Sequence, residues 1–418
     1  MSKVFIIIML SLWWKKAGSD YMLLKINKEM LAEALGSIGV HPASLGVFAN
    51  KSEIVPLKLL AVRTPAANIM KQEMLAAGGD AAIPASCIVN GEKYVDVLLL
   101  GTRKQYKILL QKMEQMPWFG MEKIKADLEA VLGEPQLQTT LADGRVLTYE
   151  KMQIMGILNI TPDSFYAGSR VPQMADVLKR AGQMLSDGAG ILDIGGESTR
   201  PGSDSVDEAE EQRRVLPVIE AVRREYPQAV ISVDTYRAAT AQAALNAGAD
   251  IINDISAMEA DSGMADVAVT SKAPIILMHM RGTPKNMQQN CEYKNVVEEV
   301  AVYLANRAQI LRDRGVGADK IILDPGIGFA KNVQQNLLLM RDLHALTSFG
   351  YPVLLAASRK STIGAVLGNV PAEERLEGTI ATSCQAVYAG AQMVRVHDVR
   401  ENTRAVRMLE AILCPQRM

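Results

Sequence analysis

The chain has 418 residues, of which 49% are hydrophobic and 22% are charged, and its formal net charge is −1 at pH 7. These values are ordinary for a globular protein with a sizeable core, and the length suggests two or three domains. The near-zero charge, with no block of like charges, argues against a nucleic-acid partner and a membrane surface. Four scattered cysteines and only four histidines argue against a zinc site and indicate a reducing, cytoplasmic compartment.

An apolar run, VFIIIMLSLWW, occupies residues 4–14 and precedes two lysines. A signal peptide is one interpretation, but only Lys3 precedes the run, no clear small-residue cleavage site follows, and the run is too short to span a bilayer. We therefore expect no export and no membrane anchor. Residues 1–21 are set apart as an apolar N-terminal segment, and translation that begins near Met22 is an alternative.

Residues 22–133 have the pattern of a small α/β domain of unknown role. Because the region contains neither a metal-ligand cluster nor a phosphate loop, we expect it to act in structure or in partner contact. Residues 134–151 are polar, include Pro135 and the Asp143–Gly144 turn, and are expected to be a linker. The strand-like and helical patterns of the small domain cover 54–62, 66–77, 95–100, 104–115 and 121–132.

From residue 152 to residue 418, short apolar runs alternate with amphipathic helical stretches. Strands that are buried on both faces are apolar throughout, and their alternation with helices indicates a parallel sheet. Eight runs predict a (β/α)8 barrel; a doubly wound sheet is the alternative, although no Gly-x-Gly-x-x-Gly motif follows any run. The runs are 154–160, 191–194, 230–233, 251–252, 275–278, 321–323, 353–357 and 393–396.

A polar or ionisable side chain ends nearly every run. In a barrel, the carboxyl ends of all strands meet at one face, and this face carries active sites. Helix capping explains single members, but Arg395 and His397 lie within or beside an apolar run and are poor caps. We therefore interpret the set as one site: Asn159, Asp193, Glu197, Asp234, Asn253, Asp254, His279, Asp324, Ser358, Arg359, Lys360, Arg395 and His397.

One half of this set suits a flat, nitrogen-rich ring. Asp234, Asn253 and Asp324 offer acceptors and an amide, which pair well with a ring edge that presents parallel N–H donors, as in a 2-amino-4-oxo-pyrimidine. Lys360 adds a cation that can donate to a ring carbonyl or nitrogen. Metal binding by the aspartates competes with this interpretation, but their positions on the third and sixth runs favour the heterocycle.

The other half suits an anion. Arg395 and His397 are two residues apart, so a strand places both on one side. Lys360 and Ser361 open a predicted helix, STIGAVLG, whose free N–H groups favour anions, at the usual phosphate position of this barrel.

Two further residues extend the anion half. Arg200, in the loop ESTRPG, could close over the same anion. A diphosphate usually binds with Mg2+, to which Asn159 could lend an oxygen. Together, these residues indicate a phosphorylated ligand.

Seven segments resemble, in order and almost without gaps, the motifs of the dihydropteroate synthase family. The N-terminal α/β module looks similar to an extension that only some members of that family carry. The segments are MGILNITPDSF (155–165), ILDIGGESTRPGS (191–203), ISVDT (231–235), GADIINDIS (248–256), ILDPGIGFAK (322–331), SRKS (358–361) and VRVHD (394–398).

The resemblance implies an enzyme that joins 6-hydroxymethyl-7,8-dihydropterin diphosphate to p-aminobenzoate, with Mg2+ as cofactor and sulfonamides as competitors. It further implies a homodimer, and a carbon–oxygen bond that breaks before the amine attacks. The resemblance also implies residue roles. The pterin is bound by Asp193, Asp234, Asn253, Asp324 and Lys360, and the diphosphate with Mg2+ by Asn159, Arg200, Arg395 and His397. The p-aminobenzoate pocket is lined by Thr199, Pro201, Phe329 and Ser361.

The sequence departs from the family pattern at three places. Ala167 stands in the first loop where an aspartate and paired glycines are usual, which puts closure of that loop in doubt. Ala356 replaces a usual glycine and Thr362 a usual large hydrophobic residue, and both could reshape the arylamine pocket. Two alternatives stay open: a methyltetrahydrofolate-dependent methyltransferase, which needs no diphosphate clamp, and a non-catalytic pterin-binding paralogue.

Overall fold

The computed structural model describes residues 31–87, 91–133, 136–160, 174–197, 206–283, 285 and 287–415. The chain divides into two compact units, with the boundary between Leu132 and Gly133. Each unit has its own buried core, so each is described separately. The predicted apolar segment 1–21 lies outside the described residues.

The N-terminal unit is built on a three-stranded antiparallel sheet in the order β1–β3–β2. Alternate residues of β3, namely Val95, Val97 and Leu99, are buried, as expected for a sheet with one covered face. They pack with Met70 of α4 and Tyr106 of α5 in one hydrophobic cluster. The elements are α2 (Leu31–Ser37), α3 (Leu45–Ala49), β1 (Ile54–Arg63), α4 (Thr64–Ala76), β2 (Asp80–Ala82), β3 (Tyr94–Thr102), α5 (Arg103–Met113) and α6 (Met121–Leu132).

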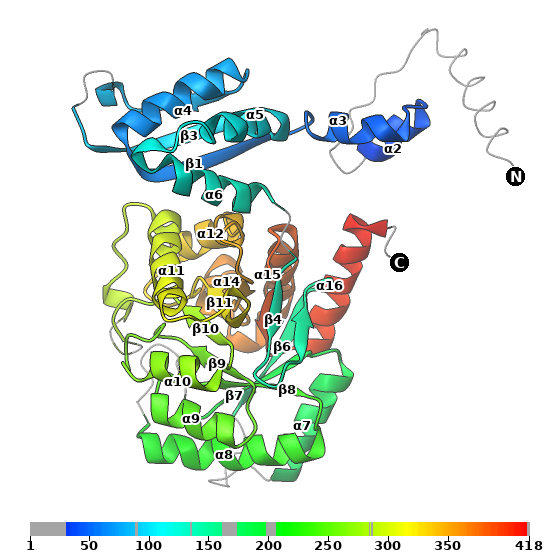
Figure 1. Cartoon of the computed structure of the whole chain (residues 1–418). Coiled ribbons are helices and arrows are strands. Elements are labelled where there is room, and N and C mark those ends of the chain that lie inside the picture. The colour runs from blue at the N-terminus through cyan, green and yellow to red at the C-terminus, as the bar shows by residue number, and fades with distance from the viewer. Residues whose placement is uncertain are drawn as a thin grey trace, which may run out of the picture. The chain divides into compact units, whose positions relative to one another are not determined.

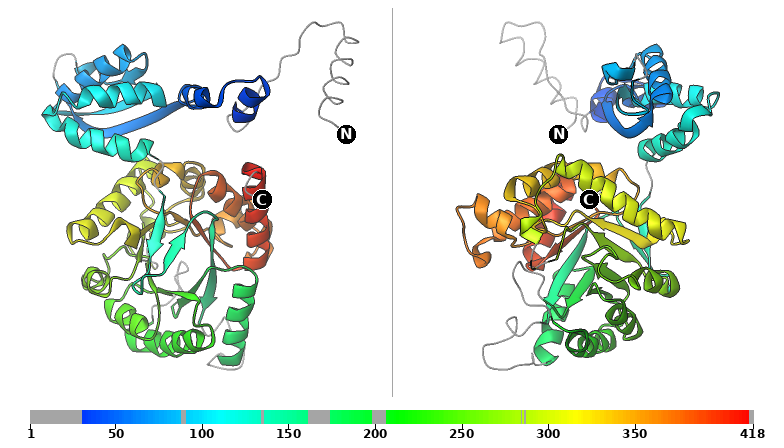
Figure 2. Two further views of the ribbon diagram at one scale, coloured as in Figure 1. Left: turned by 45° about the vertical axis from the view of Figure 1, so that its right-hand side comes forward. Right: turned by 90° about the vertical axis from the view of Figure 1, so that its left-hand side faces the viewer.

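The second unit contains the predicted barrel, which the structure confirms. Eight parallel strands are ordered as they occur in the chain, and a parallel bridge between Leu323 and Val353 joins the two ends of the sheet. The helices surround these strands (Figures 1 and 2). The strands are β6 (Gln153–Asn159), β7 (Ile191–Gly195), β8 (Val230–Asp234), β9 (Ile251–Asp254), β10 (Ile275–Met278), β11 (Ile321–Asp324), β12 (Leu354–Leu355) and β13 (Met393–Val396).

The helices of the barrel turn their apolar faces towards the strands and form its larger core. In the described part of the chain, none is long and apolar enough to cross a membrane. The helices are α7 (Met174–Ser186), α8 (Glu208–Glu225), α9 (Ala238–Asn246), α10 (Met264–Ser271), α11 (Val296–Asp313), α12 (Val333–Arg341), α13 (His344–Thr347), α14 (Ser361–Val366), α15 (Leu376–Tyr388) and α16 (Val399–Leu413).

The inside of the barrel is apolar at one end and polar at the other. Neighbouring strands are in register, and successive side chains alternate between the inside and the outside. Asp193 follows Ile191 by two residues on β7, so it lies on the same side of the strand and nearer its carboxyl end. The apolar floor consists of Met155, Ile191, Val230, Ile251, Ile276, Ile322, Leu354 and Met393.

A β-hairpin covers this floor, at the place where the sequence predicted a linker (134–151). Its strands are β4 (Gln138–Thr140) and β5 (Val146–Thr148), and Leu141 at the turn is buried against the floor residues. Lys320, just before β11, donates to the carbonyl oxygens of Thr140 and Leu141. The linker prediction was wrong for these residues because polar turn residues do not distinguish a linker from a hairpin with one apolar anchor.

We expect a variant that begins at Gly133 to fold, and a variant that begins at Met152, the predicted domain boundary, to be much less stable. The second variant lacks the hairpin and exposes the barrel floor. Losing the buried Leu141 side chain alone should cost about 2–5 kcal/mol. Thermal unfolding followed by circular dichroism compares the two, and equal melting temperatures would contradict the assignment of the hairpin to the barrel.

Candidate active site

The carboxyl ends of neighbouring strands bring the predicted side chains together. Asn159 at the end of β6 is level with Gly195 of β7, and Gly195 is level with Asp234 of β8. Asp234 is in turn level with Asn253 of β9. These side chains therefore surround one end of the barrel, as the sequence predicted.

A buried ion-pair network joins opposite parts of this end. The Arg395 guanidinium donates from Nε to Asp193, at 2.5 Å, and from Nη2 to Asp234, at 2.7 Å. The Asn253 amide donates to both carboxylate oxygens of Asp193, at 3.2 and 3.3 Å. Arg395, predicted in the diphosphate half, thus also contacts two predicted pterin residues and links both halves.

Burial controls the protonation of this network. It raises the pKa of Asp234 to about 7, and the nearby Asp193 carboxylate adds to this effect, whereas Arg395 opposes it. Burial also raises the pKa of Asp324, on β11. Both carboxyls therefore hold a proton more strongly than exposed aspartates do.

Lys360 lies beside an aromatic ring and interacts electrostatically with Asp324. Its pKa is lowered to about 8 because the side chain is buried, although Asp324 opposes the shift. The ammonium donates to the carbonyl oxygen of Ile327 and lies 4.4 Å from the centroid of the Phe329 ring. Phe329 in turn belongs to an apolar cluster with Ile255, Met278, Met280 and Met287, which could accept the face of a second flat ring.

The surroundings of His397 disfavour a charged imidazole, although the sequence placed this residue in the half that suits an anion. Burial lowers its pKa to about 3, and the nearby Arg395 and Arg359 act in the same direction. Ser358 Oγ accepts a bond from the His397 backbone N–H and lies 2.9 Å from Nδ1. The Ser358 hydroxyl can therefore donate to Nδ1, which leaves Nε2–H as a donor to an anion.

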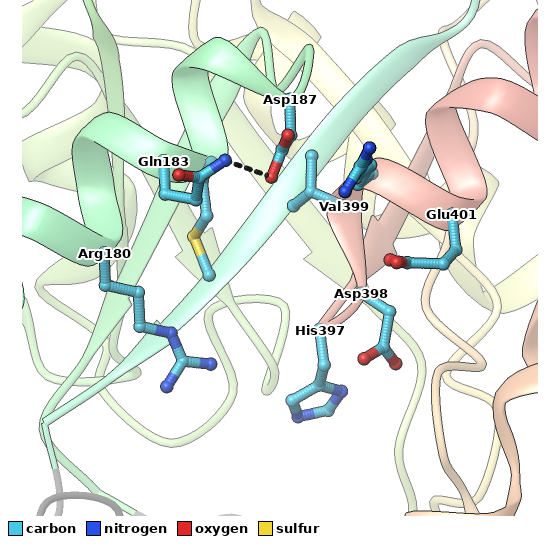
Figure 3. A pocket seen from close by; sticks show the side chains of 9 residues that line it. Arg180, Gln183, Asp187, His397, Asp398, Val399 and Glu401 are labelled. Atoms are coloured by element: carbon cyan, nitrogen blue, oxygen red, sulfur yellow. Dashed lines mark hydrogen bonds between the residues drawn. The ribbon is translucent and has the colours of Figure 1, made fainter.

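A pocket of about 390 Å3 lies beside His397, between α7 and the start of α16. Arg180 of α7 and His397 extend toward the same end of it (Figure 3). The neighbouring Asp398 is paired with Arg359, at 2.5 and 2.9 Å. Sequence reasoning missed Arg180, because an arginine on an amphipathic helix is indistinguishable from a solvated surface charge.

Three polar residues at strand ends serve mainly the scaffold. Asp254 accepts bonds from the backbone N–H groups of Ser256 and Met258, so it stabilises a turn. Glu197 pairs with Arg237 at 2.8 Å. His279 contacts the buried Lys331 ammonium through Nδ1.

A family model described as "Pterin binding enzyme" matches residues 155–397, within the barrel unit. The dihydropteroate synthase of Clostridium beijerinckii is 46% identical over 265 residues, which cover 63% of this chain and 95% of that protein. The Bacillus subtilis dihydropteroate synthase is 46% identical over 279 residues, or 66% of this chain and 95% of that protein. The chain belongs to the dihydropteroate synthase family.

Solved structures of this family agree. A Yersinia pestis dihydropteroate synthase with a sulfonamide drug matches with a TM-score of 0.62 and 40% identity, covering 66% of this chain and 99% of that one. A Burkholderia cenocepacia dihydropteroate synthase complexed with 7,8-dihydropteroate matches with a TM-score of 0.61 and 39% identity, covering 68% of this chain and 99% of that one. The predicted family is thereby confirmed.

Thr199, Arg200 and Pro201, and the departure at Ala167, lie outside the described residues. The residues on either side of 198–205 are described. Arg237 donates to the Glu197 carboxylate, at 2.8 Å, and to the Val206 carbonyl oxygen, at 2.5 Å. One guanidinium, at the start of α9, therefore contacts both ends of the segment that carries the three predicted residues.

The structure shows what the Thr362 side chain contacts. Its hydroxyl is buried and accepts a bond from the Asn336 amide of α12, at 3.0 Å. Thr362 therefore contacts a neighbouring helix through a hydrogen bond. The helix that Lys360 and Ser361 open, α14, has only six residues, which is shorter than the predicted STIGAVLG segment. Ala356, the remaining departure, is buried.

We expect Asp234→Asn to become more stable relative to the wild type as the pH rises from about 4 to about 7. In the wild type, the folded state binds the Asp234 proton more tightly than the unfolded state, so ionisation across this window destabilises the fold. Asparagine cannot ionise. The change should be on the order of a few kcal/mol. Urea denaturation at pH 5 and pH 8 measures it, and a constant difference would contradict a raised pKa.

Proposed function

We propose that the barrel joins 6-hydroxymethyl-7,8-dihydropterin diphosphate to p-aminobenzoate, giving 7,8-dihydropteroate and diphosphate in folate biosynthesis. Membership of the dihydropteroate synthase family supports this activity. The single structural observation that carries it is the meeting of the buried Asp324 and the largely buried Asp234 with Lys360, beside an aromatic wall at Phe329. This set can recognise a pterin edge and a second aromatic ring.

The pterin is held by hydrogen bonds at the polar end of the barrel. Asp234 and Asp324 accept from the N–H groups of its aminopyrimidine edge, Asn253 supplies an amide, and Lys360 donates to a ring carbonyl or nitrogen. Asp193 stays paired with Arg395 and steadies the positive charge that develops on the ring. Because these groups are already fixed by one another, little reorganisation is needed on binding.

The diphosphate is bound by donors on the other side of the same end. His397 offers its Nε2–H, while Arg395 and Arg200 supply guanidinium groups. Among the described residues, no group of three or more acidic, histidine or cysteine side chains is placed to hold a metal ion, and the Asn159 amide oxygen is the protein ligand that we propose for Mg2+ bound with the diphosphate. This arrangement suits Mg2+, which neutralises charge on the leaving group when bound.

The reaction requires no protein nucleophile. The bond between the pterin methylene carbon and the diphosphate oxygen breaks, and the electron pair leaves with the oxygen. Arg395 and His397 donate to that oxyanion, while Asp234 faces the electron-poor pterin. The nitrogen of p-aminobenzoate then bonds to the methylene carbon and releases one proton to solvent. An arylamine is already a neutral nucleophile, so no strong general base is needed.

The second substrate is placed by the apolar wall. Phe329 and the methionines around it pack against the ring of p-aminobenzoate. The family resemblance assigns Ser361, Thr199 and Pro201 to the same substrate. Sulfonamides have a similar flat aniline ring and compete for the same place.

We also propose that the enzyme acts in the cytoplasm as a homodimer. The surface of α14–α16 supports this proposal, because large hydrophobic side chains that would otherwise face water are candidates for a subunit contact. They are Val366, Leu367, Tyr388, Met408 and Ile412.

Incubation with the pterin diphosphate, p-aminobenzoate and Mg2+ should give dihydropteroate and free diphosphate in equal amounts. Lys360→Ala should lower kcat/KM by ~10²–10³-fold, the usual loss on removing one preorganised donor. Chromatography of the product and a diphosphate assay measure both results. A folded wild-type protein without product would contradict the enzyme and favour a non-catalytic pterin-binding protein.

The rate should fall at alkaline pH as Lys360 loses its proton. Its pKa of about 8 predicts that kcat/KM for the pterin diphosphate declines above about pH 8. In Lys360→Arg the guanidinium stays charged, so this decline should move to higher pH even if the rate is lower overall. The pH profile of kcat/KM for both proteins tests this, and an unchanged alkaline limb would show that another group causes it.

A further inference from the structure

A buried lysine that the proposed reaction does not use lies beside the site. Lys331 follows Phe329 by two residues, and only 2% of it is exposed. Its Nζ lies 2.9 Å from His279 Nδ1. It also donates to the carbonyl oxygens of His279, Gly326 and Phe329, at 3.2, 3.0 and 2.8 Å. All four contacts lie in or beside the loop between β11 and α12.

An ammonium suits these contacts better than a neutral amine does. Burial lowers the pKa of Lys331 well below its usual range, but three of the four neighbours are carbonyl oxygens, which only accept. Burial also lowers the pKa of His279 to about 2, so the ring is neutral, and its Nδ1 accepts when the proton is on Nε2. A neutral amine has two N–H donors and would leave more of these buried acceptors unsatisfied than the ammonium does.

A second buried side chain holds the same loop from the direction of α12. Asn336 Oδ1 accepts from the Gly328 N–H at 2.8 Å, and Nδ2 donates to the Lys331 carbonyl oxygen at 3.2 Å. The loop bends through Gly326 and Gly328, both with positive φ. A Cβ atom at Gly326 would lie 2.1 Å from the His279 carbonyl oxygen. A larger residue therefore does not fit at this position, where Lys331 donates to the backbone carbonyl oxygens of Gly326 and His279.

The 326–331 loop contacts two residues of the site. The Ile327 carbonyl oxygen, between the two glycines, accepts from Lys360 Nζ. The Phe329 ring lies 4.4 Å from the same nitrogen. A shift of the loop backbone would therefore move Lys360 and the aromatic wall together.

We propose that Lys331 is a positioning residue for the arylamine side of the site: its ammonium fixes the 326–331 loop and thereby places Phe329 and Lys360 for the incoming aromatic amine. The inference rests on the proposed function. Lys331 does not touch the substrates; it acts through the backbone carbonyls of the loop. Its removal should therefore affect the arylamine KM and kcat more than the fold as a whole.

The chain offers a matched control at the opposite end of the same strand. Lys320 precedes β11 and also donates to two backbone carbonyl oxygens, those of Thr140 and Leu141 in the floor hairpin. We expect Lys331→Met and Lys320→Met both to lower the melting temperature. Only Lys331→Met should raise the KM for p-aminobenzoate, by about tenfold or more, and lower kcat. Lys331→Gln, which keeps two donors, should fold more readily and show a smaller change in the same direction.

Steady-state kinetics with each substrate varied, together with thermal unfolding, decides the matter. An inactive but folded wild type would refute the proposed function itself. If the wild type is active, the role of Lys331 is refuted when Lys331→Met and Lys331→Gln keep the arylamine KM and kcat within twofold of the wild type. Such variants would lose only stability, as Lys320→Met should. If Lys331→Met does not fold, the Lys331→Gln kinetics alone carry the decision.

Discussion

The contact of Arg395 with Asp193 and Asp234 is the interaction on which the rest of the site depends. Charged groups inside a barrel are costly unless they are paired and hydrogen-bonded. One guanidinium on β13 compensates two carboxylates on β7 and β8, and the Asn253 amide also donates to Asp193. Removing any one of them would leave an uncompensated buried group. These four side chains of the site are therefore held in place by one another before a ligand arrives.

Along the barrel axis, the residues that stabilise the fold and the residues of the site lie at opposite ends of the same strands. Their inward residues form an apolar floor near the amino ends and a polar layer near the carboxyl ends, and a hairpin closes the floor. Apolar packing at the floor and between the strands and the helices stabilises the barrel, so the polar end can hold charges for recognition. Lys320 and Lys331 lie towards opposite ends of β11 and make similar contacts with backbone carbonyl oxygens, so this division leads us to expect different consequences from their removal.

Sequence alone predicted the barrel and most of the residues at its polar end, because parallel strands bring their carboxyl ends together whatever the details of packing. It could not predict what each charge contacts. Burial and backbone carbonyl groups leave no pattern in the sequence. They determine the inward pairing of Arg395, the lowered pKa of His397 and the hydrogen bonds around Lys331. The hairpin was mistaken for a linker because a single buried leucine, Leu141, distinguishes the two.

Thr362 shows how a departure from a family pattern can be compensated locally. A large hydrophobic side chain would hold α14 by packing alone. Here the Thr362 hydroxyl accepts from Asn336, and Asn336 also holds Gly328 and Lys331. Because hydrogen bonds depend on direction more strongly than apolar contacts do, this connection fixes the orientation of α14 relative to the Phe329 loop. The start of α14 carries Lys360 and Ser361, so one buried amide connects these two residues to the loop that carries Phe329.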